Sequence, residues 1–359
     1  MKVAIDIQTT LGQPTGFGFY VSNLIKYLER IPDLDLLKIR PPSEKDFSTP
    51  QRFFWDQFTF PRLAKGVDLL HQPCFSAPLF HKGPVLVTVH DIISILFPRN
   101  IPLASRLFYS KWMPFSYYRA AAIITISQST KNDIVKKLGI NPNKIRVTPL
   151  AVDDKFKHKV GREKISAVKR KYDLPEKYIL HVGTLEPRKN LSFLIDVFSW
   201  VIKDNRFRDY FLVITGKKGW YYEGLFTKVY KLGLSKKVIF TGYVDEADKP
   251  ALYQGAMLFA FPSVYEGFGL PPLEAMASGV PVISSNTSSM PEVISDAGIL
   301  LAPDDLDGWV KNIIRILSNS DLAAKMKQTG QKQASRFSWE KTAEKTFEVY
   351  KEVVGGRKV

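Results

Sequence analysis

The stretch that decides the fold is Pro262–Gly279, which reads PSVYEGFGLPPLEAMASG. It follows the apolar run 257–261, which has strand length and ends where the proline begins, because proline cannot donate to the next rung of a sheet. Gly267 and Gly269 permit backbone angles and close approaches that other residues avoid. Two adjacent prolines then suit the first turn of a helix. The stretch predicts a buried strand, a glycine-containing loop and a helix, which is the order found in open α/β sheets.

The same stretch indicates an anion site flanked by carboxylates. The amides near Phe268, Gly269 and Leu270 lie at the predicted N-terminus of the helix, where the helix dipole favours an anion. Glu266 and Glu274 stand on either side of these amides. An ionised carboxylate only accepts hydrogen bonds, so it suits a ligand that carries hydroxyl groups at both ends of its phosphates. This combination predicts a nucleotide sugar as the ligand.

The two glutamates also carry a resemblance to a known family. With seven residues between them, intervening glycines and prolines and a preceding strand, they resemble the signature of the large retaining glycosyltransferase family 4, also called glycosyl transferases group 1. The resemblance covers nearly the whole chain, most strongly from Tyr178 to Gly298 and least from Pro41 to Ser116. It implies an α/β fold of the GT-B type, in which two Rossmann-like domains face each other across a cleft and a C-terminal helix crosses back to the first domain.

Length and composition set the bounds for any function. The 359 residues are 45% hydrophobic and 24% charged, which predicts a globular chain of two domains and excludes disorder. No apolar run reaches the roughly 18 residues that span a bilayer, and Asp6 comes too early for a signal peptide, so we expect a cytoplasmic protein. The single cysteine, Cys74, excludes an internal disulfide and a cysteine metal cluster, and we expect it to be buried as a small apolar residue.

The formal net charge of +16 requires an explanation. Nucleic acid, an anionic membrane and an anionic substrate all fit such a charge. The sequence contains no zinc finger, aromatic RNP strand or GXXG clamp, so we expect no nucleic-acid partner. Charge that serves only solubility remains an alternative.

The first domain begins with strand 3–7, a glycine loop with Gly16 and Gly18, and a helix from about Tyr20. This is the order of a phosphate-binding loop, although the full G-x-G-x-x-G pattern is absent. The resemblance implies that Gly16 and Gly18 face the donor. The segment 41–57 lacks a sustained period and is predicted to be a variable loop on the acceptor side.

His90 follows the predicted strand 85–89, and side chains at the carboxyl ends of parallel strands point into the ligand crevice of an open sheet. The resemblance implies that this histidine approaches the donor sugar. Asp91 is equally compatible with a cap and with an acceptor contact, whereas His71 is predicted to be structural.

The segment 97–119 interleaves aromatic and basic residues. Such a pattern suits a membrane interface, where rings lie at the level of the headgroups and cations meet anionic lipid. A half-buried helix with basic outer positions explains it equally well. The sequence leaves both interpretations open.

The second domain restarts the alternation of strands and helices with strand 178–183, which ends at Gly183. Arg188 and Lys189 lie in the following loop, where a planar guanidinium and an ammonium are suited to phosphate. The resemblance matches Lys189 to the family's lysine, but Thr184 stands where an arginine is common, and we infer that Arg188 replaces it. It also implies that main-chain groups near Val244 bind the nucleobase. Asp245 and Glu246 are predicted to cap the next helix.

We therefore expect a first domain of residues 1–155 with the helix 338–359, and a second, donor-binding domain of residues 160–337. Two Asp-x-Asp motifs, Asp33–Asp35 and Asp305–Asp307, match the metal motif of a different transferase architecture. We interpret the first motif as part of a loop that leads into a strand, and the second as the N-terminus of a helix. The prediction is an enzyme with no metal and no cofactor.

The resemblance implies retaining transfer of a sugar from a nucleotide diphosphate to a hydroxyl acceptor. Glu274 would hold the ribose, Glu266 and His90 the donor sugar, and Arg188 and Lys189 the phosphates. A GDP-mannose donor and a lipid-linked glycan of cell-surface lipopolysaccharide are favoured, at the inner face of an anionic membrane. The alternatives are a UDP-sugar transferase with another acceptor and a non-catalytic, membrane-associated interaction protein.

Overall fold

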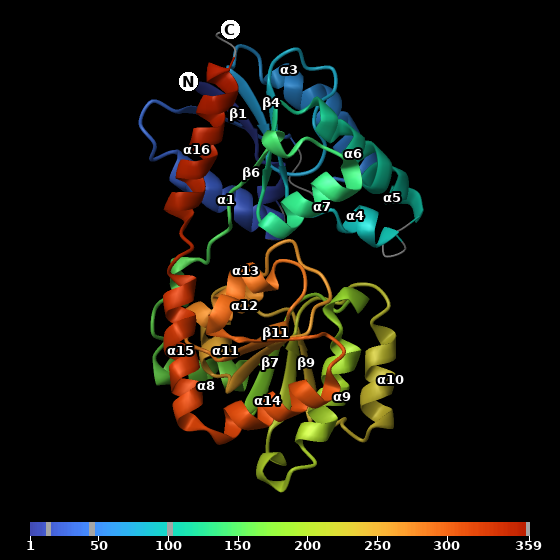
Figure 1. Ribbon diagram of the computed structural model, residues 1–359, viewed down its shortest axis with the longest axis vertical. Helices are drawn as coiled ribbons and strands as arrows, with labels where there is room; N and C mark the ends of the chain where they lie inside the picture. The colour runs from blue at the N-terminus through green and yellow to red at the C-terminus, as the bar shows by residue number, and fades with distance from the viewer. Residues whose placement is uncertain (12–15, 43–46, 99–102, 357–359) are drawn as a thin grey trace. The chain divides into compact units, whose positions relative to one another are not determined.

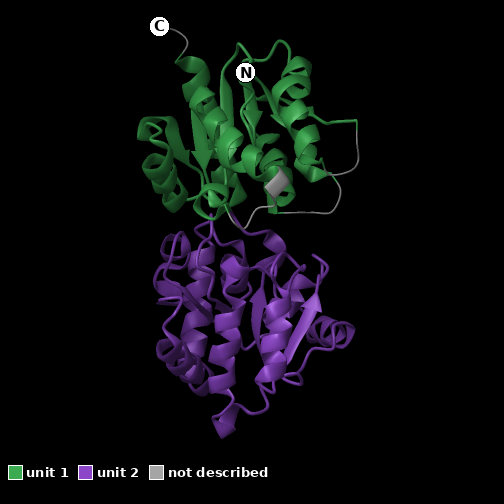
Figure 2. Cartoon of the chain, turned by 90° about the vertical axis from the view of Figure 1, so that its right-hand side faces the viewer, with its two compact units in different colours: residues 1–150, 338–359 green, residues 151–337 purple. Residues whose placement is uncertain are grey.

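The computed structural model describes residues 1–11, 16–42, 47–98 and 103–356 (Figure 1). The chain forms two compact units, coloured separately in Figure 2. Unit 1 contains Met1–Leu150 and Ser338–Val359, and unit 2 contains Ala151–Phe337. The chain thus leaves unit 1 once and returns to it with its last helix.

Unit 1 is built on a six-stranded sheet of order β2-β1-β3-β4-β5-β6, in which every neighbouring pair is parallel. Its strands are β1 (Lys2–Asp6), β2 (Asp35–Ile39), β3 (Leu69–Gln72), β4 (Val85–Val89), β5 (Ala122–Thr125) and β6 (Ile145–Val147). Its helices and short helical turns are η1 (Gln8–Thr10), α1 (Gly16–Leu28), α2 (Thr49–Phe54), η2 (Trp55–Thr59), α3 (Phe60–Leu63), α4 (Ile93–Leu96), α5 (Leu103–Leu107), η4 (Phe108–Trp112), α6 (Met113–Ser116), η5 (Tyr117–Arg119), α7 (Gln128–Leu138), η6 (Pro142–Lys144) and α16 (Trp339–Gly355).

Unit 2 repeats this plan with a parallel sheet of order β12-β11-β10-β7-β8-β9. Its strands are β7 (Tyr178–Val182), β8 (Phe211–Thr215), β9 (Val238–Gly242), β10 (Leu258–Phe261), β11 (Val282–Ser285) and β12 (Ile299–Leu301). Its helices and turns are η7 (Asp154–Phe156), α8 (Arg162–Lys171), η8 (Pro187–Lys189), α9 (Leu191–Val201), η9 (Asn205–Phe207), α10 (Glu223–Lys231), α11 (Lys249–Gln254), α12 (Leu270–Ala277), α13 (Met290–Ile294), η10 (Ser295–Ala297), α14 (Leu306–Ser318) and α15 (Ser320–Ala334).

The central strands are continuous apolar runs because helices cover both faces of each sheet. Every residue of β4 and of β10 is buried. Each unit has its own core, with Trp55 and Phe60 in unit 1 and Phe198 and Trp309 in unit 2. Both sheets are therefore rigid platforms for the loops that follow their strands.

The order of the strands in unit 2 locates a crevice. The chain runs from β7 to β8 and β9 on one side, and then places β10 on the other side of β7. Ligands of open α/β sheets bind at such a switch point, beyond the carboxyl ends of the strands. The loops after β7 and β10 carry Arg188, Lys189 and Glu266, so the predicted donor residues meet at this point.

Three expectations about unit 1 need correction. Helix α1 begins at Gly16, so Gly16 and Gly18 form its first turn rather than a glycine loop. A Cβ at Gly18 would collide with the carbonyl oxygen of Thr9, so the backbone leaves no room for a side chain there. The expected loop 41–57 contains α2, whose start is fixed by Gln51 Oε1 accepting from the amide of Ser48 at 2.9 Å.

The segment 97–119 is helical from Leu103 to Arg119, and Arg99 lies outside the described residues. Within the residues that the structure describes, no helix is both long enough and apolar enough to span a membrane.

Candidate functional site

Glu266 is the centre of a buried charged cluster in unit 2. Its Oε1 accepts from Lys189 Nζ at 2.5 Å, and its Oε2 lies 2.8 Å from Arg188 Nη1. Arg188 Nη2 also donates to Glu186 Oε1 at 2.5 Å, and Ser263 Oγ donates to Glu266 Oε1 at 2.5 Å. Two carboxylates and two cations thus balance each other in a site with little access to water.

The charges of the cluster shift the pKa of Glu266. Burial by itself would raise this pKa, but the Lys189 ammonium and the Arg188 guanidinium, with the hydrogen bonds from Lys189 and Ser263, lower it to about 2. Burial is also the main influence on Lys189, whose pKa it lowers despite the opposing charge of Glu266. Glu266 is therefore ionised at neutral pH and acts only as an acceptor.

The backbone holds both cations in place. Val264 N donates to the carbonyl oxygen of Arg188 at 2.9 Å, which ties the loop after β7 to the loop after β10. Asn190 ends η8 with φ 54° and anchors the loop by donating to Pro303 O at 2.8 Å. At Gly183 a Cβ would lie 3.3 Å from Lys189 Cε, so a side chain there would press on the lysine. Gly183 therefore provides room for Lys189.

The N-terminus of α12 lies in the same loop. Gly269 precedes the helix with φ 108°, and a Cβ there would collide with the methyl group of Met290. Ser289 Oγ donates to the carbonyl oxygens of Glu266 at 3.0 Å and Phe268 at 2.7 Å. Since C=O and N–H point in opposite directions in a trans peptide, the amide of Gly269 points away from Ser289. The first turn, with Leu270, presents its amide end at the switch point.

Glu274 lies within α12 and is held by Tyr253 of α11. The Tyr253 hydroxyl donates to Glu274 Oε2 at 2.7 Å, deep in the unit. Burial raises the pKa of Glu274, and the nearby ammonium of Lys249 opposes this shift. The hydrogen bond from Tyr253 fixes the orientation of the carboxylate.

The turn after β9 differs in part from expectation. Val244 is buried, and its main-chain contact with a nucleobase stays a prediction. Asp245 and Glu246 do not cap α11, because Asp245 pairs with Lys171 at 2.6 Å and Glu246 pairs with Lys155 at 3.2 Å and with Lys249. Asp248 occupies the position before α11 instead.

His90 lies in unit 1 at the end of β4. Its Nε2 is 3.0 Å from the carbonyl oxygen of Pro73, which can only accept, so Nε2 carries the proton and Nδ1 the lone pair. The rings of Phe17 and Tyr20 pack against it, with centroids 4.8 Å and 4.7 Å away. Burial lowers the pKa of His90 to about 4, with the hydrogen bond to Pro73 opposing this shift. His90 is thus a neutral imidazole beside the first turn of α1 that holds Gly16 and Gly18.

A second buried charged cluster in unit 1 was not predicted. Arg52 Nη1 lies 3.7 Å from Asp6 Oδ2 and 3.8 Å from Asp56 Oδ1. The Arg52 guanidinium also lies 4.1 Å from the centroid of the Phe75 ring, which contacts Phe17 at 5.6 Å. Through these rings the cluster and His90 occupy neighbouring positions at one end of the sheet.

The comparisons with known proteins decide the family. Residues 162–333 match Glycosyl transferases group 1, and residues 21–156 match Glycosyltransferase Family 4. The chain is 34% identical over 285 residues to O-antigen chain mannosyltransferase B of Escherichia coli, an alignment that covers 79% of this chain and 74% of that protein. This chain belongs to glycosyltransferase family 4.

Two further matches of this glycosyltransferase agree with this family and with the expected fold. Serotype-specific mannosyltransferase WbdA of Escherichia coli is 33% identical over 265 residues, which cover 72% of this chain and 32% of that longer protein. The structure of Anabaena Alr3699/HepE in complex with UDP and glucose aligns with a TM-score of 0.74 at 19% identity, over 98% of this chain and 99% of that one. The fold is therefore GT-B over the whole chain.

The sequence of the glycosyltransferase did not reveal the partners of its site. Glu186, Ser263, Tyr253 and Ser289 all hydrogen-bond to predicted site residues. Ser263 stands three residues before Glu266 and Glu186 two residues before Arg188, so proximity in sequence could have indicated both. Tyr253 and Ser289 come from other elements, and no sequence pattern marks them.

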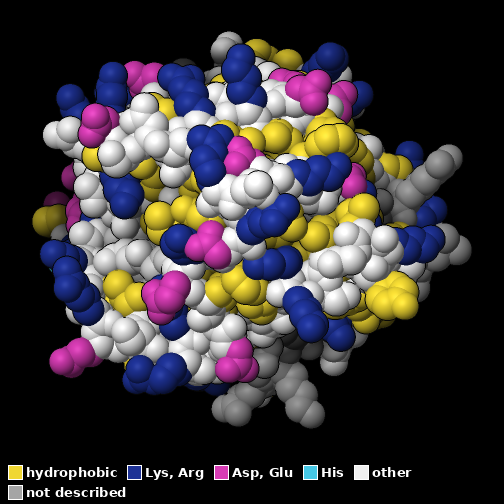
Figure 3. All heavy atoms as spheres, turned by 90° about the horizontal axis from the view of Figure 1, so that it is seen from below, with side chains coloured by type: hydrophobic (Ala, Val, Ile, Leu, Met, Phe, Trp, Pro, Cys, Tyr) yellow, Lys and Arg dark blue, Asp and Glu magenta, His cyan; other side chains and the backbone are white. Residues whose placement is uncertain are grey.

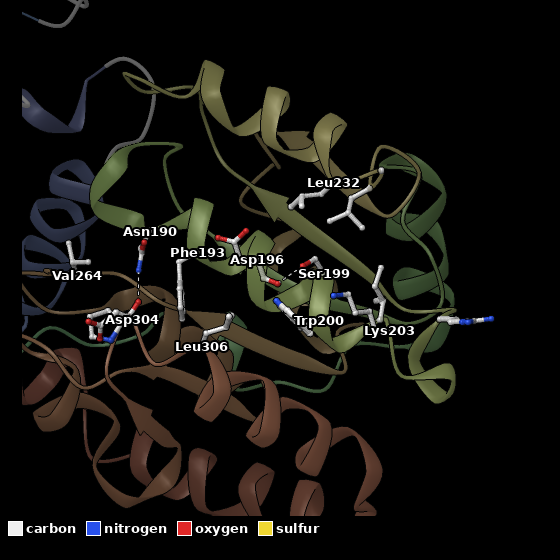
Figure 4. Close-up of a pocket in the computed structure, with 15 residues that line it drawn as sticks. Asn190, Phe193, Asp196, Ser199, Trp200, Lys203, Leu232, Val264, Asp304 and Leu306 are labelled. Carbon is white, nitrogen blue, oxygen red and sulfur yellow. Dashed lines mark hydrogen bonds between the residues drawn. The ribbon is translucent and has the colours of Figure 1, made fainter.

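A depression of about 1130 Å³ on unit 2 of the glycosyltransferase reaches Asn190 and Val264 of the loops that hold the charged cluster (Figure 4). Its lining includes Phe193, Trp200 and Lys203 of α9 and its end, but not Glu266 or Lys189. We do not assign the donor to it, because the predicted phosphate-binding residues do not line it. Among the described residues, no three His, Cys, Asp or Glu side chains are grouped to hold a metal ion.

Proposed function

We propose that this glycosyltransferase transfers mannose from GDP-mannose to a hydroxyl of a lipid-linked glycan, with retention at the anomeric carbon and without a metal ion. The observation that carries the proposal is the cluster of Lys189, Arg188 and Glu266 beside the N-terminus of α12. Two cations and a helix N-terminus suit a diphosphate, and the fixed carboxylates suit hydroxyl groups on either side of it.

Negative charge grows on the departing phosphate during transfer. Lys189, Arg188 and the amides near Phe268, Gly269 and Leu270 would stabilise this charge more strongly in the transition state than in the bound substrate. In this role they replace the divalent cation that other transferases use. Glu266 would accept from hydroxyls of the donor sugar, and Glu274, oriented by Tyr253, from the ribose.

His90 would contact the donor sugar. Because its Nε2 proton is held by Pro73, its Nδ1 lone pair is the group that would accept from a sugar hydroxyl. Polar side chains of the neighbouring cluster, such as Asp6, would suit the hydroxyls of the acceptor glycan.

The choice of mannose is supported by the relatives, which are named O-antigen chain mannosyltransferase B and serotype-specific mannosyltransferase WbdA. An acceptor with a lipid carrier lies at a membrane surface, and the net charge of +16 suits the anionic inner face.

Calorimetric titration tests the proposal. The protein is titrated with GDP, UDP and ADP in the presence of EDTA, together with the Lys189→Ala and Glu274→Ala variants. A hydrogen bond to a charged group contributes roughly 1.5–3 kcal/mol, so each variant should bind GDP about tenfold to a hundredfold more weakly. Lys203→Ala, an exposed lysine of unit 2 outside the site, is the matched control.

Preference for UDP would overturn the guanine assignment alone. Absence of binding by any of the three nucleotides, in protein that is folded by circular dichroism, would overturn the transferase proposal. The configuration of the product, read from its anomeric NMR coupling, tests retention separately.

A further inference from the structure

An exposed aromatic ridge lies on unit 1, on the helices α2 to α3 and α5 to η5 and on the loop before β4. Its rings form an unbroken series of contacts, with centroids 5.9 Å apart for Phe58 and Phe80, 6.2 Å for Phe53 and Phe58, 5.1 Å for Phe53 and Trp112 and 6.4 Å for Trp112 and Phe115. We call Phe53, Phe54, Phe58, Phe80, Trp112 and Phe115 the aromatic ridge.

The ridge faces solvent. Phe54, Phe80 and Phe115 are 60%, 69% and 59% exposed. Along the second helical segment Leu107, Lys111 and Phe115 recur every fourth residue and are all exposed, so this helix turns an apolar and basic stripe outward. Contiguous exposed apolar patches mark interaction sites, whereas single exposed hydrophobic residues are normal.

The loop that carries Phe80 is fixed from both sides. Leu79 N donates to Gln57 Oε1 at 2.9 Å, and Arg119 Nη2 donates to the carbonyl oxygen of His81 at 2.5 Å. Phe80 is thus held in its exposed position by groups of two different helical segments. This bond also gives Arg119 a structural role, so it is not a suitable residue for testing the surface.

The charge around the ridge is of one sign. In segments 49–66, 79–84 and 103–119, Arg52 and the one acidic residue, Asp56, are both buried, and the basic residues that are not buried are Arg62, Lys65, Lys82, Arg106, Lys111 and Arg119. Phe58 and Phe80 line a groove of about 640 Å³, and Arg62, Lys65 and Lys82 are the charged residues of its lining.

We propose that the aromatic ridge binds the surface of an anionic phospholipid bilayer, with the exposed rings at the depth of the headgroups and lipid phosphates in the groove beside Arg62, Lys65 and Lys82. Exposed aromatic rings bordered by cations are the pattern of proteins that lie on anionic membranes. A second copy of this chain fits less well, because it would bring two surfaces of the same charge together.

This inference deepens the proposed function, since a lipid-linked acceptor lies in the same membrane, but the surface itself belongs to unit 1 alone. Vesicle flotation tests it on the full chain, with vesicles of phosphatidylcholine alone or with about one third phosphatidylglycerol. The parent should float with the anionic vesicles and not with the neutral ones.

Two sets of variants locate the surface. The triple variant Phe54→Ser, Phe80→Ser, Phe115→Ser should lower the bound fraction about tenfold or more. The matched control Trp200→Ser, Tyr221→Ser, Tyr230→Ser, which removes three exposed rings from unit 2, should bind like the parent. Lys65→Glu with Lys82→Glu should abolish the preference for anionic vesicles, whereas Lys231→Glu with Lys236→Glu, also in unit 2, should keep it.

GDP titration of every variant separates this proposal from the proposed function, because the predicted phosphate-binding residues lie in unit 2. Unchanged GDP binding with lost flotation supports the ridge whatever the acceptor is. A parent that does not float, a triple serine variant that floats like the parent, or a unit 2 control that loses flotation equally would overturn it. Light scattering that shows a dimer of the parent and a monomer of the triple serine variant would also overturn it and assign the ridge to self-association.

Discussion

At the scale of single residues, the donor site depends on charges that are buried together. Glu266 faces Lys189 and Arg188, and Glu186 faces Arg188 from the other side. The residue types at 188, 189, 266 and 274 could be predicted because they follow strand ends in a recognisable pattern. Their partners could not, because Lys189 and Glu266 are 77 residues apart in sequence and only folding brings them together.

The balance of this cluster makes Glu266 a stabilising residue. Glu266→Gln should lower the free energy of unfolding of unit 2 by about 3 kcal/mol, because it leaves two buried cations with one carboxylate. Urea denaturation followed by tryptophan fluorescence measures the loss. Glu176→Gln removes an exposed partner of Lys169 and should change little. If both variants unfold at the same urea concentration, the cluster does not stabilise unit 2.

At the scale of elements, buried parallel strands can be predicted because they are short apolar runs between turn residues. β4 was predicted with its observed ends. β12 was not predicted, since it has three residues and all are only half-buried, which leaves little pattern. The early start of α1 and the presence of α2 were missed because glycine, proline and polar residues at helix starts resemble those of loops.

The start of α12 gives a prediction at this scale. Gly269→Ala should weaken GDP binding about tenfold, because the left-handed backbone and the contact with Met290 both oppose a side chain, at a cost of roughly 1–3 kcal/mol. Gly330→Ala is the control, since it lies inside α15 and its Cβ would only touch Met276 at 3.4 Å. Calorimetry measures both. Equal affinity of the two variants would show that the geometry before α12 does not matter for binding.

At the scale of the whole molecule, charge and protonation are distributed over both units. Figure 3 shows one face, on which Lys and Arg side chains are spread between hydrophobic and acidic ones rather than gathered in one patch. Three histidines, His71, His90 and His181, are buried, and burial lowers the pKa of each, to about 3, 4 and 3. As the pH falls below the ordinary histidine pKa, the unfolded chain can bind a proton at each of these residues more readily than the folded chain can. Each buried histidine therefore lowers the stability of the fold in acid.

His71 allows this linkage to be tested. Its Nδ1 lies 2.7 Å from the Tyr350 hydroxyl and its Nε2 2.9 Å from Thr88 Oγ1. Its contribution to stability is complete above the ordinary pKa of 6.5 and decreases as the pH falls toward 3. His71→Gln should therefore destabilise the protein most at pH about 7.5. The difference in free energy of unfolding between parent and variant should be smaller by roughly 2 kcal/mol at pH about 5.

Urea unfolding of parent and variant at both pH values measures this difference in free energy of unfolding. His158→Gln, at an exposed position, should follow the parent at both. A difference in free energy of unfolding that is the same at both pH values would contradict the linkage between folding and protonation of His71.

The return of the chain to unit 1 has a consequence for synthesis. Tyr350 and Thr346 of α16 are fully buried in unit 1, and Tyr350 contacts His71 of β3. During synthesis, α16 of unit 1 therefore leaves the ribosome only after all of unit 2 has emerged. Unit 2 is the first to have all its residues, and a nonsense codon near residue 338 would leave it complete while depriving the earlier-made unit of its closing helix.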